Sequence, residues 1–452
     1  MEEADRISSL PQDVLVSILS RLELKDAIRT SVLAHSWRHL WTHLPHLPHL
    51  ILGPNGDRLG DTTDIYSNDP VPSSWIERVH HVVSSLHGPL LYFSLFHSFS
   101  ADQFALLQRL LDLLLQKGPI EMLYLSSFSG RGVIHLPSFH SLKELLLRRC
   151  HIVLPAGFQG LVRLSTLTLH YIQISNDDLH SLIHLSNNLT TFIGTHFAAL
   201  GDQRISIKLS LPFLRHLEFG FSHHVEKVEV VSAPCLEQVK IQNFIFLDYL
   251  QPFASMNLEF LTSTAVTVSS LSLDFCFLES LSLAALPLNF TFPQVRQLEL
   301  HLIIRNMNKR MYDAFIWLLQ SMLFLEELHI KVDDNKSDTN WVDVQMLELF
   351  SMKYDGLSCL DKTLKSVIID IEDLNGVMAG ITLVKFFMLN ARVLDLVKVA
   401  YRFGSEVEPN MIEELQKAKA TTSSKANVVI IRQKENELLM LNNWIMARTQ
   451  RR

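Results

Sequence analysis

Histidine is the residue whose abundance and spacing first suggest chemistry in this chain: there are 21, and five stand at positions 35, 39, 43, 46 and 49. Residues four apart share one face of an α-helix, so His35, His39 and His43 could offer three imidazoles to a metal ion. Trp37 and Trp41 would lie roughly opposite, because two residues turn a helix by about 200°. A solvated histidine face beside a buried tryptophan face explains the same spacing, and we predict no metal ligand.

Catalytic motifs are missing from the sequence. None of G-x-x-x-x-G-K-[ST], G-x-G-x-x-G, G-x-S-x-G or H-E-x-x-H occurs, so nothing predicts a P-loop, a dinucleotide site, a nucleophile elbow or a zincin. The four cysteines, at positions 150, 235, 276 and 359, form no C-x-x-C and are expected to be reduced thiols. We predict no catalytic residue and no cofactor, and the rival prediction is a hydrolase triad assembled from dispersed Ser, His and Asp residues.

Composition and charge restrict the class of protein further. Hydrophobic residues make up 48% and charged residues 19% of the 452 residues, as in globular proteins. The formal net charge is −7 without a long block of like charge, so we expect no nucleic-acid partner. No run of about 20 apolar residues predicts a membrane helix, and the acidic N-terminus lacks the apolar core of a secretory signal. We therefore expect an intracellular protein, nuclear or cytoplasmic, with no membrane partner.

One pattern recurs along the chain: an apolar residue, two variable residues, an apolar residue, one variable residue and a third apolar residue. The spacing is within or near the 20 to 29 residues of a leucine-rich repeat as far as position 278 and irregular beyond it. One repeat cannot bury its own apolar face, so repeats stack into a curved solenoid with a parallel sheet on the concave side. Clear copies start at Ile120, Leu142, Leu164, Leu214, Leu236, Leu278, Val295, Leu325 and Leu364, and weaker copies at Leu189 and Leu258.

The variable positions of each expected strand face outward, because successive side chains of a strand point to opposite faces. Concave solenoid faces usually bind ligands, although solvation alone explains any single polar residue there. The candidates for binding a target protein are Glu144, Arg148, His216, Glu218, Lys240, Glu299, His301 and His329, with Thr166, His170, Gln238, Gln297, Glu327 and Lys331 beside them. Two further features fit the repeats: residues 104–116 predict a backing helix, and Cys150 occupies the turn position where this repeat class has Asn or Cys.

Residues 5–50 predict three short helices. Pro11 and Asp13 suit the start of the first helix. Its apolar residues at helical spacing are Val14, Leu15, Ile18, Leu19 and Leu22. A second helix is expected over residues 24–33, and a third carries Trp37, Leu40, Trp41 and Leu44. About 45 residues cannot build a self-sufficient core, so the solenoid or a partner must complete it.

Three runs carry a resemblance to a known family: Leu10-Pro11-x-x-Val14-Leu15-x-x-Ile18-Leu19-x-x-Leu22, Arg29-Thr30-Ser31-Val32-Leu33, and Ser36-Trp37-Arg38-x-Leu40-Trp41. Together they resemble the F-box of plant F-box proteins that also contain leucine-rich repeats and an FBD domain. The resemblance implies docking on the Skp-type adaptor of a Skp/cullin/F-box ubiquitin ligase and, through the adaptor, on a cullin. The adaptor-binding residues that it implies are Leu10, Pro11, Val14, Leu15, Ile18, Leu19, Leu22 and Trp37.

The C-terminal part agrees with this resemblance. Residues 364–369 and 384–394 are similar to the FBD domain, whose core has a lysine, two apolar residues and then Leu-x-Asn-Ala-Arg-x-Leu. Residues 423–430 would be its closing strand. An Arg-containing segment often precedes that strand in the family, whereas this chain has Lys417-Ala-Lys-Ala-Thr-Thr there. We expect the domain to cap the last apolar edge of the solenoid.

The predicted fold class is α/β, a short all-helical F-box followed by a curved leucine-rich-repeat solenoid with an FBD-like C-terminal cap. The predicted function is a non-catalytic substrate receptor of the ligase, with an unidentified target protein on the concave face. A leucine-rich-repeat scaffold without a ligase role is the alternative. Exposure of the apolar residues between positions 10 and 22 would distinguish the receptor from the scaffold. The expected boundaries are 1–50 for the F-box, 51–119 for a linker and entry segment, 120–356 for the solenoid, 357–432 for the FBD-like domain and 433–452 for a C-terminal helix or tail.

Overall fold

A computed structural model gives the fold, and the chain divides into two compact units. The first unit comprises Met1–Leu214 and His224–Glu226, and the second comprises Arg215–His223 and Lys227–Arg452. The structure describes residues 9–22, 24–44, 49–52, 73–87, 89–97, 103–127, 132–198, 204–222, 224–243, 267–284, 289–303, 307–332, 356–371, 376–401, 413–417 and 425–432, with a few isolated residues between them.

The N-terminal helices of the first unit begin where the sequence predicts. Helix α1 is Gln12–Leu19 and follows Pro11, and helix α2 is Leu24–Arg29. The expected third α-helix is wrong. In its place are short 3₁₀ turns, Thr30–Val32, His35–Trp37 and Leu40–His43. These turns bring Trp37, Leu40 and Trp41 into one core without the 3.6-residue repeat, because tertiary packing outweighs the α-helical period in such short segments.

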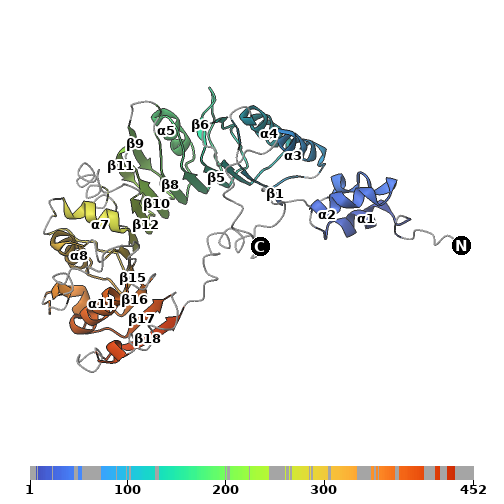
Figure 1. Cartoon of the computed structure of the whole chain (residues 1–452). Coiled ribbons are helices and arrows are strands. Elements are labelled where there is room, and N and C mark those ends of the chain that lie inside the picture. The colour runs from blue at the N-terminus through green and yellow to red at the C-terminus, as the bar shows by residue number, and fades with distance from the viewer. Residues whose placement is uncertain are drawn as a thin grey trace. The chain divides into compact units, whose positions relative to one another are not determined.

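The rest of the first unit is a run of parallel strands with helices on one side (Figure 1). In-register apolar residues such as Leu123, Leu145, Leu167 and Phe192 stack from strand to strand and are buried. The strands are β1 (His49–Leu52), β2 (Tyr92–His97), β3 (Met122–Ser127), β5 (Glu144–Arg148), β7 (Thr166–His170) and β8 (Thr191–Thr195). Other elements are α3 (Ser73–Ser85), α4 (Phe104–Lys117), α5 (Asn176–His184), the paired β4 (Val133–His135) and β6 (His151–Val153), and β9 (Ile205–Ser210).

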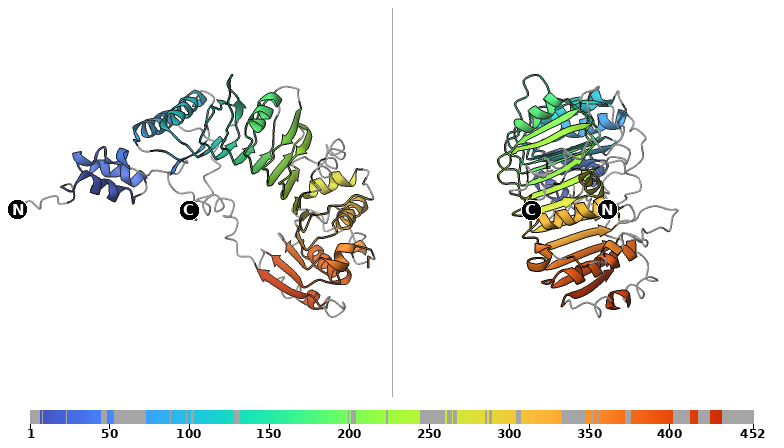
Figure 2. Two further views of the ribbon diagram at one scale, coloured as in Figure 1. Left: turned by 180° about the vertical axis from the view of Figure 1, so that it is seen from behind. Right: turned by 90° about the vertical axis from the view of Figure 1, so that its left-hand side faces the viewer.

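The second unit continues the same strand-and-helix plan in its own right. Its parallel strands are β10 (His216–Phe221), β12 (Gln238–Asn243), β13 (Ser270–Leu273), β14 (Gln297–Leu302), β15 (Glu327–Val332), β16 (Ser366–Ile371), β17 (Leu396–Tyr401) and β18 (Asn427–Arg432). Its helices α7 (Phe275–Ser282), α8 (Lys309–Ser321), α10 (Ser358–Lys362) and α11 (Gly376–Asn390) lie along one side of these strands (Figure 2). Strand β11 is Val225–Ser232.

The predicted repeats agree with the strands except at one copy. The copy starting at Leu278 is wrong, because those residues form helix α7, whose first turn is capped by the Asp274 carboxylate accepting from the Phe277 N–H at 2.8 Å. The strand of that repeat lies earlier, at β13, with Val268, Leu271 and Leu273 as its buried apolar residues. The weaker copy at Leu258 lies outside the described residues.

Other strands lie where no repeat copy was predicted. Strands β1 and β2 stand at the start of the first unit's sheet, and β2 lies within the segment expected to be a linker. At the other end β17 and β18 extend the second unit's sheet in parallel, so the segment resembling the FBD domain continues the repeat plan. Helix α11 ends there at Asn390, whose side-chain carbonyl accepts from the Tyr354 N–H at 2.6 Å. Among the described helices, none is long and apolar enough to cross a bilayer.

Candidate functional site

The F-box residues form a small core that the start of the repeat region completes. Leu86, which follows α3, belongs to this core, and Val82 packs against it. The expectation that apolar residues outside the motif help to complete its core is therefore confirmed for the contact with the end of α3. The buried members within the motif are Leu15, Val16, Leu19, Ala27, Trp37, Leu40, Trp41 and Leu44.

A second set of F-box side chains faces solvent. Ile7, Leu10, Val14, Ile18 and Leu22 recur every three or four residues and are between 37% and 57% exposed. We call these five residues the apolar stripe. Val14 and Ile18 lie on helix α1, Ile7 and Leu10 precede it, and Leu22 follows it. Isolated exposed leucines are ordinary, but a series of large exposed apolar residues marks an interaction surface.

Two more apolar side chains follow helix α2. Val32 is 87% exposed and Leu33 is 69% exposed, and neither was predicted as a binding residue. The run that contains them was quoted only for its resemblance, so their exposure is new information from the structure. The F-box therefore leaves apolar area uncovered on α1 and after α2.

Polar contacts hold the F-box to the end of α3. The His87 N–H donates to the Thr42 carbonyl at 3.0 Å, and the His43 and His87 rings stack with centroids 4.8 Å apart. Lys117, at the end of α4, donates to the Leu86 carbonyl at 2.7 Å. The C-terminus of α3 is thus joined to both the F-box and α4, which fixes the F-box to the first repeats.

The sheet face of the second unit that points away from its helices carries matched charges. Lys240 Nζ lies 3.1 Å from Glu218 Oε1, across neighbouring strands that pair in register. Further along, Lys331 donates to Glu299 at 2.6 Å, and His329 Nε2 lies 2.8 Å from Asp370 Oδ2. Burial opposes ionisation of Glu299, but the hydrogen bond and charge of Lys331 outweigh it and lower the pKa of the carboxyl.

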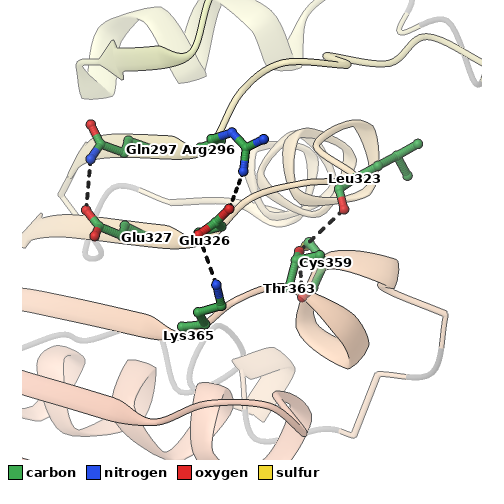
Figure 3. Close-up of polar contacts among 8 residues, drawn as sticks. All are labelled: Arg296, Gln297, Leu323, Glu326, Glu327, Cys359, Thr363 and Lys365. Carbon is green, nitrogen blue, oxygen red and sulfur yellow. Dashed lines mark hydrogen bonds and ion pairs between the residues drawn. The ribbon is translucent and has the colours of Figure 1, made fainter.

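A second charged row runs along the beginnings of these strands (Figure 3). Glu326 accepts from Lys365 at 3.1 Å and also from Arg296, while Gln297 donates to Glu327 at 3.0 Å. The hydrogen bonds from Lys365 and Arg296 lower the pKa of Glu326. Every cation of this row shown in Figure 3 has a carboxylate beside it, so the row aligns neighbouring repeats.

The corresponding sheet face of the first unit is arranged differently. Glu144 accepts from the Tyr124 hydroxyl at 2.8 Å at one end of the strands. At the carboxyl ends, Arg148, His170 and Thr195 stand in register on β5, β7 and β8, and His170 Nδ1 lies 2.7 Å from the Thr195 hydroxyl. In the described part of the chain no carboxylate forms a salt bridge with Arg148.

Directly after these three strands the backbone repeats an unusual conformation. Arg149, Tyr171 and His196 each have φ of 55°, the left-handed region that L-residues rarely adopt. Their side chains form a column: the Arg149 guanidinium carbon lies 5.2 Å from the Tyr171 ring centroid, and the Tyr171 and His196 rings stack at 3.9 Å. The same turn in three successive repeats therefore places a cation and two rings in line.

The electrostatic environment of this cluster is cationic. Burial, together with the nearby charges of His170, Arg148 and Arg149, lowers the pKa of His196 to about 4. Among the described groups that shift this pKa, all the charged ones are basic. Basic groups thus gather around His196 at the ends of β5, β7 and β8.

The described residues form no metal site, and one of their cysteines is deeply buried. No group of three or more His, Cys, Asp or Glu residues among them is arranged to hold a metal ion. The turns that replace the expected third helix also remove the shared helix face on which the histidine alternative depended. Burial raises the pKa of the Cys150 thiol to about 12, which disfavours the thiolate form that nucleophilic attack requires.

The structure sorts the residues predicted to bind partners. Leu15, Leu19 and Trp37 are core residues of the F-box, whereas Leu10, Val14, Ile18 and Leu22 are exposed and Pro11 is exposed beside them. The predicted target residues all lie on strands and point away from the buried leucines, but in two units: Glu144 and Arg148 in the first, and His216, Glu218, Lys240, Glu299, His301 and His329 in the second. Sequence reasoning missed Arg149, Tyr171 and His196, whose signal was their common position directly after a strand.

Comparison with known proteins finds two family models along the chain. The F-box domain matches residues 7–49, and the leucine-rich repeats of the FBD-associated F-box protein At5g56370 match residues 107–251. Neither is the model of an enzyme family. The second match covers β3 to β12, the repeats whose spacing is most regular in the sequence.

Individual relatives come from Arabidopsis thaliana. The chain is 33% identical to the F-box/FBD/LRR-repeat protein At1g13570 over 188 residues, which are 40% of this chain and 42% of that protein. It is 25% identical to the F-box protein At5g03100 over 60% of this chain and 79% of that protein. The chain thus spans less than half the length of At1g13570. It carries an F-box domain and leucine-rich repeats of the FBD-associated type, and its homologues are Arabidopsis F-box proteins.

Proposed function

We propose that this protein is a non-catalytic substrate receptor of a Skp/cullin/F-box ubiquitin ligase. The observation that carries the proposal is the exposed apolar stripe on an otherwise packed F-box, since a scaffold that used the motif only for its own core would cover these residues. In this role the F-box holds a Skp-type adaptor, the adaptor holds a cullin, and the repeats hold a target protein.

The division of the F-box residues assigns them different tasks. Leu10, Val14, Ile18 and Leu22 contact the adaptor, while Leu15, Leu19 and Trp37 hold the helix in place from below. Large apolar residues at the centre of an interface dominate its energy, and each costs about 2 kcal/mol or more on truncation. The stripe is therefore the place to disrupt docking without unfolding the domain.

The contribution of the receptor is effective concentration. The hydrogen bonds of His87 and Lys117 join the F-box to the first repeats, so an adaptor on the F-box is held at a limited range of distances from a target on those repeats. Such tethering converts encounter of the target with the ubiquitin-charged enzyme into an intramolecular event. The chain forms no covalent intermediate in this scheme. We propose further that the segment resembling the FBD domain caps the repeat stack.

Binding of the full-length protein to a purified Skp-type adaptor tests the proposal. Ile18→Asp places a charge in the apolar stripe at a side chain that is 40% exposed, and we expect it to weaken adaptor binding about 30-fold or more. Val162→Asp, at an exposed apolar residue of the repeats, is the matched control and should bind as the wild type does. Circular dichroism checks that both variants are folded.

Two results would contradict this function. One is a folded wild-type protein that does not bind the adaptor, which leaves the leucine-rich-repeat scaffold as the better account. The other is an Ile18→Asp variant that binds with undiminished affinity, which would place docking elsewhere. Leu19→Asp is unsuitable as a test, because Leu19 is fully buried and its replacement unfolds the F-box.

A further inference from the structure

The last described strand of the second unit leaves apolar side chains partly uncovered. Val428 and Ile430 on β18 stand in register with Val397 and Val399 on β17. Register neighbours in a parallel sheet share a face, so all four point to one side of the sheet. Val397 and Val399 are 0% and 1% exposed, whereas Val428 and Ile430 are only partly buried. The core side of the sheet is therefore incompletely covered at β18.

A neighbouring strand, β16, shows how this face is normally closed. Helix α11 follows β16 after residues 372–375 and packs back on the same strand. Gly380 of α11 comes so close to the strand that an added β-carbon would lie 2.6 Å from Ile371 Cδ1. Ile369 and Ile371, on the core side of β16, are accordingly 0% and 1% exposed. The core side of β16 is thus covered by the helix that follows the strand.

Within the described part of the chain, no helix follows β18. The helical residues 413–417 precede this strand and lie against α11, since Lys385 Nζ donates to the Glu414 carboxylate at 3.1 Å. Strand β18 ends at Arg432, and residues 433–452 follow it in the sequence. The partly covered face of β18 therefore stands directly before a segment that lies outside the described residues.

The sequence of that segment has the signals of a buried helix. Asn436 can cap its first turn as Asn308 caps α8, where the Asn308 side chain accepts from the Met311 N–H at 3.1 Å. Glu437 suits the start of a helix and Arg448 suits the end, because of the helix dipole. The residues between them are mostly apolar: Leu438, Leu439, Met440, Leu441, Trp444, Ile445 and Met446. A helix that is apolar around most of its circumference is buried, as α11 is.

We propose that residues 437–447 form a helix that docks on the core side of β18 and covers Val428 and Ile430. Residues 433–436 separate this helix from β18, and an equal number of residues separates β16 from α11. A helix of this length extends about 16 Å and β18 about 20 Å, so the helix covers most of the strand. Docking removes two apolar surfaces from water at once.

A segment of the same chain fits this face better than a second copy of the protein does. Residues 437–447 are tethered to β18 by a short connection, which gives them a high effective concentration at the strand. A second copy would have to displace them and would also lose its freedom of movement on association. The cover does not depend on the ligase role, and it extends the hydrophobic core of the second unit beyond β17.

Amide hydrogen exchange, followed by mass spectrometry on the full-length protein, tests this docking. We expect residues 438–446 to exchange about tenfold or more slowly than the same peptide free in solution, because a docked helix protects its amides. Leu441→Asp places a charge in the apolar segment and should speed exchange in both that segment and β18 about tenfold, with β16 unchanged. Asn443→Asp is the matched control. It should leave both regions protected, because two residues turn a helix by about 200° and Asn443 lies opposite Leu441.

A matched pair of variants on β18 identifies the face on which the segment docks. Ile430→Asp places a charge on the core side and should speed exchange of residues 438–446 about tenfold. Ile431→Asp places the same charge on the opposite side of the sheet, at a side chain that is 38% exposed, and should leave that exchange slow. Slow exchange of β16 in both variants shows that the repeats remain folded.

Four results would overturn this docking. The first is exchange of residues 438–446 in the wild type at the rate of the free peptide, and the second is a Leu441→Asp variant in which β18 stays as protected as before. The third is release of the segment by Ile431→Asp but not by Ile430→Asp, which would place it on the open sheet face. The fourth is protection that disappears on dilution of the protein, which would assign the cover to a second copy.

Discussion

The sheet faces of the two units are built from the same repeat and differ in how charge is arranged: Lys143 pairs with Glu121 at the beginnings of the first unit's strands, but basic residues gather at their carboxyl ends. In the second unit Glu218, Glu299 and Asp370 each lie against a basic side chain on another strand. In the first unit Arg148 stands beside Arg149 and His170 without a salt bridge among the described residues. The charges on the second unit's face pair across strands, whereas basic side chains gather at the strand ends of the first unit.

The difference shows that a polar residue on a repeat surface is not a binding residue by its position alone. Cross-strand pairs of opposite charge stabilise a sheet and leave little charge for a partner. Like charges in the same positions weaken the sheet. The most informative experiments therefore reverse or remove the matching on one face.

Reversing a charge in the second unit should have the largest effect on stability. Glu299→Lys places an ammonium group beside Lys331 and near Lys240 and His329. Because the pair is partly exposed, we expect the free energy of unfolding to fall by about 2 kcal/mol at low salt and by less at high salt. Urea unfolding at two salt concentrations measures this.

A neighbouring position provides the matched control. Gln297 lies on the same strand and faces Glu327, so Gln297→Lys introduces an equal charge beside a carboxylate. We expect the free energy of unfolding to change by less than about 0.5 kcal/mol. Equal losses in the two variants would mean that the matching of charges on this face contributes nothing.

The pH dependence of the first unit should reveal the basic surroundings of His196. His196 has a pKa of about 4 in the fold, whereas an unfolded histidine titrates near 6.5, so the unfolded state binds a proton first as the pH falls. Stability is therefore fully present above pH 6.5 and is lost as the pH falls toward 4. After allowance for solvent screening, we expect His196→Gln to remove about 1 kcal/mol of that loss.

A charge reversal sharpens the same measurement. Arg148→Glu replaces a cation near His196 with an anion, so it should raise the pKa of His196 and reduce the loss of stability between pH 6.5 and 4. Urea unfolding at several pH values gives the loss, and the imidazole signals in NMR give the pKa. A His196→Gln variant with the same loss as the wild type would show that other groups cause the acid sensitivity.

Much of the fold follows from local patterns in the sequence. Strands β3, β5, β7, β8, β10 and β12 could be predicted because alternate apolar residues in one spacing specify a buried face, whereas no repeat copy predicted β4, β6, β9 or β11. The copy at Leu278 failed because its apolar residues also fit a helix, and the capping residue Asp274 decides between the two. The third F-box helix failed because tertiary packing sets the conformation of segments of three or four residues.

The candidate sites were less predictable than the fold. The family motif of the F-box identifies its apolar residues but does not separate Leu19, which is buried, from Ile18, which is exposed, because both fit one amphipathic helix. The sequence predicts which residues of a strand lie on the open sheet face. It does not predict their salt bridges, because these depend on the register between strands. Register is set by the turns. The left-handed turns at Arg149, Tyr171 and His196 could not be predicted, because none of these positions is a glycine.

The smallest expected effect comes from the hydroxyl that orients His170. Thr195→Val keeps the shape of a buried strand residue and removes its hydrogen bond to His170 Nδ1. We expect the free energy of unfolding to fall by less than about 1 kcal/mol, since one neutral hydrogen bond is lost. Urea unfolding measures this change. Unaltered stability would mean that the hydrogen bond between Thr195 and His170 contributes nothing to the fold.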